Sequence, residues 1–282
     1  MAILYAFCCL GFAAVNDFVF KMFARKERSR GWFVAGAGMV WLLVLGFLPI
    51  DWQHSVGATL LCGAISGLFS VTANLLLIEA MGRQSAGVCS TIFRLNLVLV
   101  VIAACLWLGE SINPAKIIGV GLAVVAIVAF VPPGVGRKSG MRTTAELGLF
   151  LALAACLLRA GMGLTYKWGF LRGADSNGVV VINSFFWIIG GILYAWLREK
   201  DPKINPKLVG YGIFSGVLIS GIVLFMALAL KYGNASVTLP IAQMSFLGTF
   251  GLSIIFFKEP VTWRKIVAVL CGVAAILLLV LG

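Results

Sequence analysis

The sequence predicts an all-α integral membrane protein whose ten transmembrane helices form two inverted five-helix repeats. Three observations predict this fold. Apolar segments of about twenty residues recur along the chain, the second half repeats the first, and the basic residues lie in alternate loops. Of the 282 residues, 61% are hydrophobic and 11% are charged, whereas a soluble domain is about half apolar and a quarter charged. The chain therefore lacks the polar surface that a soluble protein exposes to water.

The apolar segments are expected to be helices. Within lipid a backbone must satisfy its own hydrogen bonds, which requires a helix or a closed barrel. Barrel strands alternate polar and apolar residues, and these segments do not. The first segment carries Asn16, Asp17 and Lys21, so we expect a span there and not a cleaved signal peptide. The ten expected spans are residues 2–24, 31–49, 56–80, 85–108, 114–131, 146–168, 177–197, 207–231, 234–257 and 263–281.

The net charge of +12 is unevenly distributed along the chain. Of 22 Lys and Arg residues, fifteen lie in loops after odd-numbered spans, three lie in loops after even-numbered spans, and four lie within spans. This positive-inside pattern places the basic loops in the cytoplasm and both termini outside it, in a cell inner membrane. Because the basic residues border apolar spans, we expect contact with the lipid bilayer and no nucleic-acid partner.

A shift of 149 residues aligns the second half of the chain with the first. Each copy holds five spans, so the second copy must enter the membrane from the opposite side, as in many secondary transporters. We expect a first repeat at 1–131, a cytoplasmic linker at 132–145 and a second repeat at 146–282. The aligned identities include Gly63 with Gly212, Gly67 with Gly216, Ala80 with Ala229, Ile92 with Ile241, and Glu110 with Glu259.

Several kinds of chemistry are not expected. The seven cysteines all lie in apolar segments without a CxxC pair, and the single histidine is His54. We therefore expect neither a disulfide framework nor a metal site, and no Ser-His-Asp triad. No GxxxxGK[ST] motif occurs, so nucleotide hydrolysis is not the expected energy source. The prediction is a protein without cofactors that is not an enzyme.

The second half carries a recognisable pattern. It comprises Ala229-Leu230-Lys231-Tyr232, then Asn234-Ala235-Ser236, Pro240 within the ninth span, and Lys258-Glu259 at the end of that span. In this respect the chain resembles an EamA-type transporter of the drug/metabolite transporter superfamily. The resemblance covers nearly the whole chain and implies a central cavity and export or exchange of small metabolites. Two departures are Thr91 in the place of Pro240, and the charges of Glu79 and Arg94. Family members are often described with cytoplasmic termini, which the charge distribution here does not favour.

Two arginines lie deep in apolar spans. Arg94 is about nine residues into its span, roughly 14 Å deep at 1.5 Å per residue, and Arg159 is similarly placed in the sixth span. An arginine at the bilayer centre costs about 2.5–3.5 kcal/mol on insertion scales, unless it faces water or a carboxylate. We expect both to line a substrate pathway. The alternative is a structural ion pair, of Arg94 with Glu79 or of Arg159 with Asp17.

Other polar residues in the spans complete the candidate binding site. Asp17 and Lys21 are four residues apart and can pair along one helix, and Gln243 is the repeat mate of Arg94. Lys21, Lys167 and Glu79 lie toward span ends, where an interfacial position is the alternative. The asparagines are explained equally well by interhelical hydrogen bonds. The candidate substrate-binding residues are Arg94, Arg159, Lys167, Lys21, Asp17, Glu79, Gln243, Asn96 and Asn16.

These features predict a secondary active transporter that works by alternating access. The excess of interior cations favours a small-molecule substrate such as an amino acid or an organic anion, exported or exchanged across the cytoplasmic membrane. A proton or a counter-substrate is the expected coupling species, and the expected state is a monomer or homodimer. The alternatives are a flippase for a lipid-linked or amphipathic substrate, an integral-membrane enzyme, and a non-transporting subunit.

Overall fold

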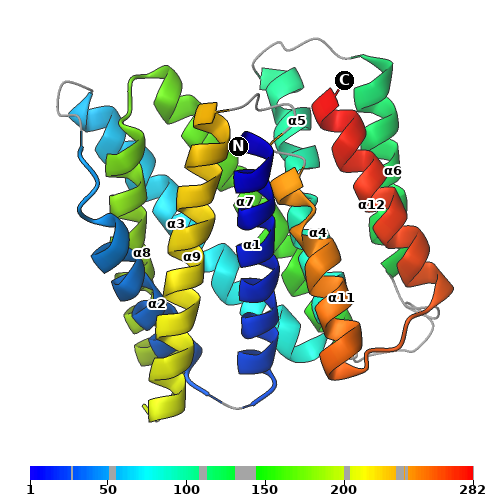
Figure 1. Ribbon diagram of the computed structural model, residues 1–282, viewed down its shortest axis with the longest axis horizontal. Helices are drawn as coiled ribbons and strands as arrows, with labels where there is room; N and C mark the ends of the chain where they lie inside the picture. Colours follow the sequence, from blue (N-terminus) through cyan, green and yellow to red (C-terminus); the bar gives the residue numbers. More distant parts are fainter. Residues whose placement is uncertain are drawn as a thin grey trace.

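The computed structural model describes residues 1–26, 28–50, 55–107, 113–130, 144–199, 204–232, 238 and 241–281. Throughout these residues the regular secondary structure is helical (Figure 1). The helices are α1 (Ala2–Ala24), α2 (Arg30–Leu45), α3 (Val56–Arg83), α4 (Ala86–Arg94), α5 (Asn96–Trp107), α6 (Pro114–Phe130), α7 (Thr144–Leu171), α8 (Ser176–Arg198), α9 (Pro206–Tyr232), α11 (Ser245–Phe257) and α12 (Trp263–Leu281).

The prediction of ten helical spans is confirmed, with one refinement. The fourth span consists of two helices, α4 and α5, which are separated at Leu95. Most of the predicted start of the ninth span, residues 234–240, lies outside the described residues. Helices α1, α3, α7, α8 and α9 are long and apolar enough to cross a membrane, and four shorter apolar helices accompany them.

Polar side chains fix where several helices begin. Ser29, Ser55 and Ser85 each accept a hydrogen bond from the backbone N–H three residues later, at the starts of α2, α3 and α4. Asp175 does the same at the start of α8. Such caps satisfy N–H groups that have no partner within the helix, so these helices begin close to where the apolar pattern begins.

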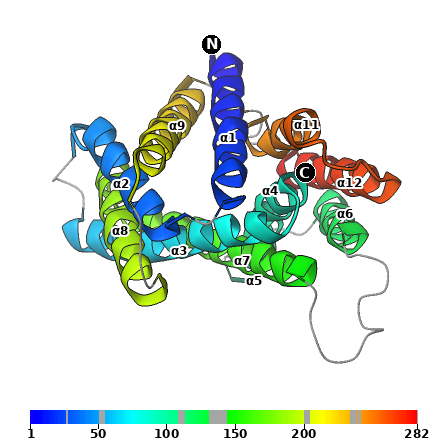
Figure 2. The same cartoon turned by 90° about the horizontal axis from the view of Figure 1, so that it is seen from below.

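Helices from each half of the chain pack mainly on helices from the other half. Helix α1 packs on α9 and α11, while α7 packs on α3, α4 and α5. Helix α2 packs on α8 and α9, α3 packs on α8, and α6 packs on α12. The same helix pairs result when each helix is exchanged for its counterpart in the other repeat. The counterparts are α1 and α7, α2 and α8, α3 and α9, the α4–α5 pair and α11, and α6 and α12. Figure 2 shows α1 between α9 and α11, with α3 and α7 crossing beside it. Two inverted repeats related by a pseudo-two-fold axis account for this arrangement.

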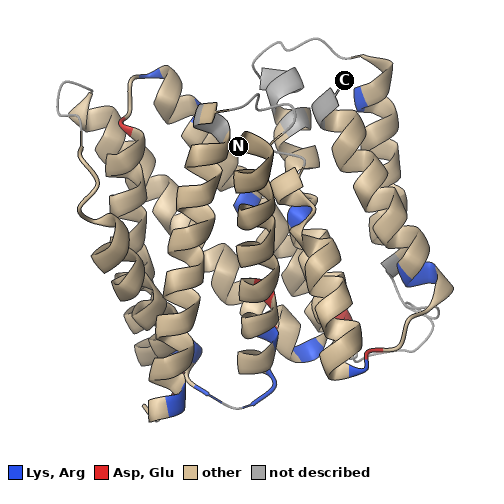
Figure 3. Ribbon diagram, in the orientation of Figure 1, with Lys and Arg blue, Asp and Glu red and all other residues tan. Residues whose placement is uncertain are grey.

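The basic residues gather at one end of the bundle. In Figure 3 the Lys and Arg positions cluster toward the lower end, whereas both termini lie at the upper end. The lower end carries the end of α1, the start of α2, the end of α3 and the end of α11. We call it the basic end.

Glycines allow the repeats to approach closely. A Cβ at Gly63 or Gly67 of α3 would lie 2.7 or 2.8 Å from the side chains of Ile182 or Phe186 in α8. The mate of Gly67 is Gly216 of α9, where a Cβ would lie 2.8 Å from the carbonyl oxygen of Ala37 in α2. These glycines therefore permit close helix contact.

A single methyl group added between α2 and α8 should destabilise the bundle. A Cβ at Gly191 of α8 would lie 2.6 Å from both the Gly31 carbonyl oxygen and the Ala35 backbone nitrogen of α2. Because backbone atoms cannot rotate away, Gly191→Ala should lower the free energy of unfolding by about 1–3 kcal/mol. Thermal unfolding of the purified protein in detergent measures this. Gly210→Ala in α9 is the control, because no atom lies within 4 Å of its Cβ position. Equal stability of the two variants would contradict the observed α2–α8 packing.

Candidate functional site

The side chain of Asp17 connects three helices in the interior of the bundle. Asp17 lies in α1 and is 3% exposed. Its Oδ2 accepts hydrogen bonds from Ser90 Oγ of α4 at 2.6 Å and from Thr249 Oγ1 of α11 at 3.4 Å. Arg94 Nη2 of α4 lies 3.4 Å from the same oxygen. A buried carboxylate requires such partners, so Asp17 ties the first repeat to the second.

Arg94 therefore pairs with Asp17, and the two alternative ion pairs are not observed among the described residues. The Arg94–Glu79 pair does not form, because Glu79 contacts other cations. The Arg159–Asp17 ion pair does not form within the described residues, where Arg94 takes that carboxylate. The pair between Asp17 and Lys21 along α1 is also absent there. Each of these two residues contacts neighbouring helices instead, because interhelical partners supply several hydrogen bonds.

Phe93 brings the two deep arginines together. The guanidinium carbons of Arg94 and Arg159 each lie 5.8 Å from the Phe93 ring centroid. Arg159 Nη1 also lies 3.1 Å from Met162 Sδ on the next turn of α7. Among the described residues no carboxylate forms an ion pair with Arg159. The site thus contains two guanidinium groups and one paired carboxylate, a net positive charge.

Both repeats interrupt a helix beside this site. Leu95 separates α4 from α5 with φ −70° and ψ 0°, and Met244 precedes α11 with φ −75° and ψ 8°. Leu95 and Met244 are repeat mates, as are Arg94 and Gln243, which immediately precede them. Asn96 Nδ2 donates to the Phe93 carbonyl at 2.7 Å, a local bond that competes with regular helix hydrogen bonds. Asn96 therefore supports the backbone of the site.

Lys21 lies in a second cluster at the basic end. Its Nζ donates to the carbonyl oxygens of Met81 at 2.8 Å and Gln84 at 2.7 Å, at the end of α3. Nζ also lies 3.9 Å from Glu259 Oε1 beyond α11, and this oxygen accepts from the Ala86 backbone N–H at 3.1 Å. Lysines commonly stabilise the last carbonyls of a helix, and here a lysine of another helix does so.

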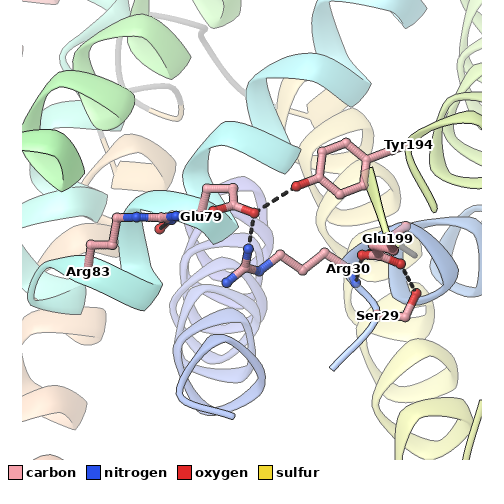
Figure 4. Close-up of polar contacts among 7 residues, drawn as sticks. Ser29, Arg30, Glu79, Arg83, Tyr194 and Glu199 are labelled. Atoms are coloured by element: carbon pink, nitrogen blue, oxygen red, sulfur yellow. Dashed lines mark hydrogen bonds and ion pairs between the residues drawn. The ribbon is translucent and has the colours of Figure 1, made fainter. Parts of the chain in front are cut away.

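Glu79 lies in a third cluster, also at the basic end. It forms ion pairs with Arg30 of α2 and Arg83 of α3, and it accepts a hydrogen bond from Tyr194 Oη of α8 at 2.7 Å (Figure 4). Glu199 is drawn beside Ser29 and the backbone of Arg30, and it accepts a hydrogen bond from the Arg30 backbone N–H at 2.7 Å. The Glu79 cluster therefore joins α2, α3 and α8, separately from Asp17.

The remaining predicted residues lie elsewhere. Asn16 Oδ1 accepts from Ser215 Oγ of α9 at 2.7 Å, which is the interhelical alternative foreseen for the asparagines. Lys167 is partly buried in α7, two helical turns beyond Arg159. Sequence reasoning missed Ser90 and Thr249 as partners of Asp17. The sequence did indicate that Ser90, four residues before Arg94, lies on the same helix face as Arg94.

The described residues contain no cluster of three or more His, Cys, Asp or Glu side chains able to hold a metal ion. The polar groups of the site are instead guanidinium, carboxylate, amide and hydroxyl groups. Such groups bind and orient an ionic ligand through hydrogen bonds.

Comparisons with known proteins identify the family. The sequence profile of the EamA-like transporter family matches residues 1–131 and 146–281. An uncharacterized protein of Methanocaldococcus jannaschii is 31% identical over 102 residues, which cover 34% of this chain and 74% of that protein. One crystal structure superposes with a TM-score of 0.64 at 14% identity, covering 98% of this chain and 95% of the other, and shows likeness of fold alone. The chain belongs to the EamA-like transporter family, in the drug/metabolite transporter superfamily.

Proposed function

We propose that this protein is a secondary active transporter for a small metabolite that carries a carboxylate, either an amino acid or an organic anion. The observation that carries the proposal is the pair of guanidinium groups on the Phe93 ring, of which only that of Arg94 has a carboxylate partner among the described residues. The substrate carboxylate supplies the missing negative charge at Arg159.

The electrostatics favour an anionic group at this place. An unpaired arginine at mid-bilayer depth costs about 2.5–3.5 kcal/mol on insertion scales. Asp17 offsets one of the two positive charges. A bound carboxylate offsets the other and forms charge-assisted hydrogen bonds with a guanidinium, whose planar fork fits a carboxylate. The arginines therefore favour an anion over a neutral or cationic solute.

Alternating access follows from the two-repeat architecture, with residues 1–131 and 146–282 as the repeats that change position. In the present conformation the Lys21 and Glu79 clusters join helices at the basic end. We infer that these clusters hold that end closed, and that their release opens it. A proton or a counter-substrate drives the cycle, in export or exchange.

The orientation is part of the proposal: the basic end faces the cytoplasm and both termini face outward. The concentration of Lys and Arg at one end of the bundle supports it, because basic loops are retained on the cytoplasmic side.

Removing the unpaired guanidinium should weaken transport of carboxylates. Arg159→Gln should raise the KM for a transported carboxylate by about tenfold to a hundredfold, the usual value of a hydrogen bond to a charged group. Arg159→Lys should retain part of the affinity, because it keeps the charge and loses the planar fork. Uptake of amino acids and organic acids into proteoliposomes measures the effect. Arg172→Gln is the control, since Arg172 is exposed and lies over the Trp168 ring. Unchanged KM values for Arg159→Gln across the panel would reject the proposed role.

Removing the Lys21 ammonium should loosen the basic end. Cys89 of α4 is fully buried in the present conformation and serves as a native reporter. Lys21→Met should raise its rate of modification by a small methanethiosulfonate several-fold, because the bonds to the end of α3 are lost. Mass spectrometry of the modified peptide identifies the cysteine. Lys26→Met is the control at an exposed position just beyond the end of α1. Equal rates in wild type and Lys21→Met would show that Lys21 does not hold this end closed.

The orientation can be tested with two introduced cysteines. In intact cells a membrane-impermeant thiol reagent should label Asn177→Cys, near the end opposite the basic end, and leave Lys26→Cys unlabelled. After permeabilisation both should react. The unsubstituted chain gives the background from its native cysteines. The reverse labelling pattern would place the termini in the cytoplasm.

A further inference from the structure

The two repeats interrupt their helices in the same way. In the first repeat Leu95 N–H donates to the Ile92 carbonyl at 3.1 Å, and Val98 N–H donates to the Leu95 carbonyl at 3.0 Å. In the second repeat Met244 N–H donates to the Ile241 carbonyl at 3.2 Å, and Leu247 N–H donates to the Met244 carbonyl at 2.9 Å. The three positions in each repeat correspond at the shift of 149 residues. The interruption is thus a feature of the repeat and not of one helix.

The two interruptions face each other. Helices α4 and α11 are antiparallel neighbours, since the start of α4 at Ala86 bonds to Glu259 just beyond the end of α11. Ser90 Oγ and Thr249 Oγ1 lie 3.5 Å apart where the helices meet. One turn further along α4 is Arg94, and one turn back along α11 is Ser245. Antiparallel packing therefore brings these two residues to the same level, each beside an interruption.

Unsatisfied polar atoms concentrate at this level. Among the described residues, six buried side-chain nitrogen or oxygen atoms have no hydrogen-bond partner. Three of the six are Arg94 Nε, Gln243 Oε1 and Ser245 Oγ. Ser245 is fully buried. Buried polar atoms in proteins nearly always have a partner, so a cluster of unsatisfied ones marks a place where a ligand or water completes the hydrogen bonds.

The unsatisfied atoms differ in character between the two repeats. Arg94 can only donate hydrogen bonds, whereas Gln243 Oε1 can only accept them and Ser245 Oγ can do either. The α4 side thus suits a carboxylate, and the α11 side suits an N–H donor. A simple dicarboxylate fits poorly, because its second carboxylate would meet the lone pairs of Gln243 Oε1.

We propose that Arg94, Gln243 and Ser245, at the two facing helix interruptions, bind an α-amino carboxylate. Its carboxylate pairs with Arg159 and accepts a hydrogen bond from Arg94 Nε, while Asp17 keeps its contact with Arg94 Nη2, and its ammonium donates to Gln243 Oε1 and Ser245 Oγ. This assignment rests on the proposed function and narrows its substrate class from carboxylates in general to zwitterions. The pseudo-symmetric backbone supplies two similar positions, and the sequence difference between repeats makes one a donor and the other an acceptor.

Matched pairs of ligands test the assignment. The probes are glycine with acetate, L-leucine with 4-methylpentanoate, and L-glutamate with glutarate, titrated calorimetrically into the purified full-length protein. Each amino acid that binds should bind about tenfold to a hundredfold more tightly than the partner lacking the ammonium. Ser245→Ala and Gln243→Leu should each bring the ratio of the two affinities close to one. Gln243→Glu should keep the preference, because the acceptor oxygen remains.

The control is Ser253→Ala. Ser253 lies on the same helix α11, is equally buried, and bonds to the Phe250 carbonyl. Ser253→Ala should leave the preference for the amino acid over the simple acid unchanged. Equal binding of amino acids and simple acids by wild type would overturn this assignment and leave the proposed carboxylate transporter intact. A wild-type preference unaffected by Ser245→Ala and Gln243→Leu would overturn it as well. Absence of binding and uptake for every carboxylate would reject the proposed function together with it.

Discussion

The bundle interior depends on the burial of one carboxylate, Asp17, among donors from two neighbouring helices. A carboxylate in a low-dielectric interior is costly unless it is fully hydrogen-bonded or paired. Ser90, Thr249 and Arg94 meet this requirement together, and they do so from α4 and α11, which belong to opposite repeats. The requirement therefore fixes where α1, α4 and α11 meet. Because the ion pair of Asp17 among the described residues is with Arg94, the charge of Arg159 stays available at the same level of the bundle.

The pseudo-symmetry makes the backbone of the two repeats alike and leaves their side chains free to differ. Leu95 and Met244 adopt nearly the same dihedral angles in the two halves. The residues before them are Arg94 and Gln243, a cation and a neutral amide. A symmetric site would present the same groups from both sides and would suit a symmetric ligand. This divergence gives the site a polarity across the pseudo-two-fold axis, so a ligand with unlike ends binds in one orientation.

Much of the fold could be predicted from sequence, because helix length and hydropathy alone define the spans. The bounds predicted for the first and last spans match α1 and α12, and the predicted inverted repeat accounts for the observed exchange of packing partners. The partners of individual charges could not be predicted in this way. Periodicity reports the depth and the face of a residue but not which helix lies opposite. The Asp17–Lys21 pair that the spacing allows is not observed for this reason, since both side chains contact helices distant in sequence. The interruption at Leu95 was missed because it contains neither proline nor glycine.

The contacts at the basic end differ in kind from those around Asp17, and the difference bears on how the repeats can move. Lys21 bonds mainly to two backbone carbonyls at the end of α3, which water can solvate once the helices separate. Breaking these bonds at an end of the bundle exposes the ammonium to water instead of stranding it in lipid, so the free-energy cost is moderate. Separating Arg94 from Asp17 in the dry interior would instead leave two uncompensated charges. A cycle that opens and closes the basic end while Asp17 and Arg94 stay together therefore avoids the largest electrostatic cost. Lys167 of α7 lies toward the other end of the bundle, and an offset of 146 residues, three fewer than the repeat shift of 149, aligns it with Lys21 of α1. The inverted architecture thus provides a lysine near each end of the bundle. Between them lies the Arg94–Asp17 ion pair, whose separation has the highest electrostatic cost.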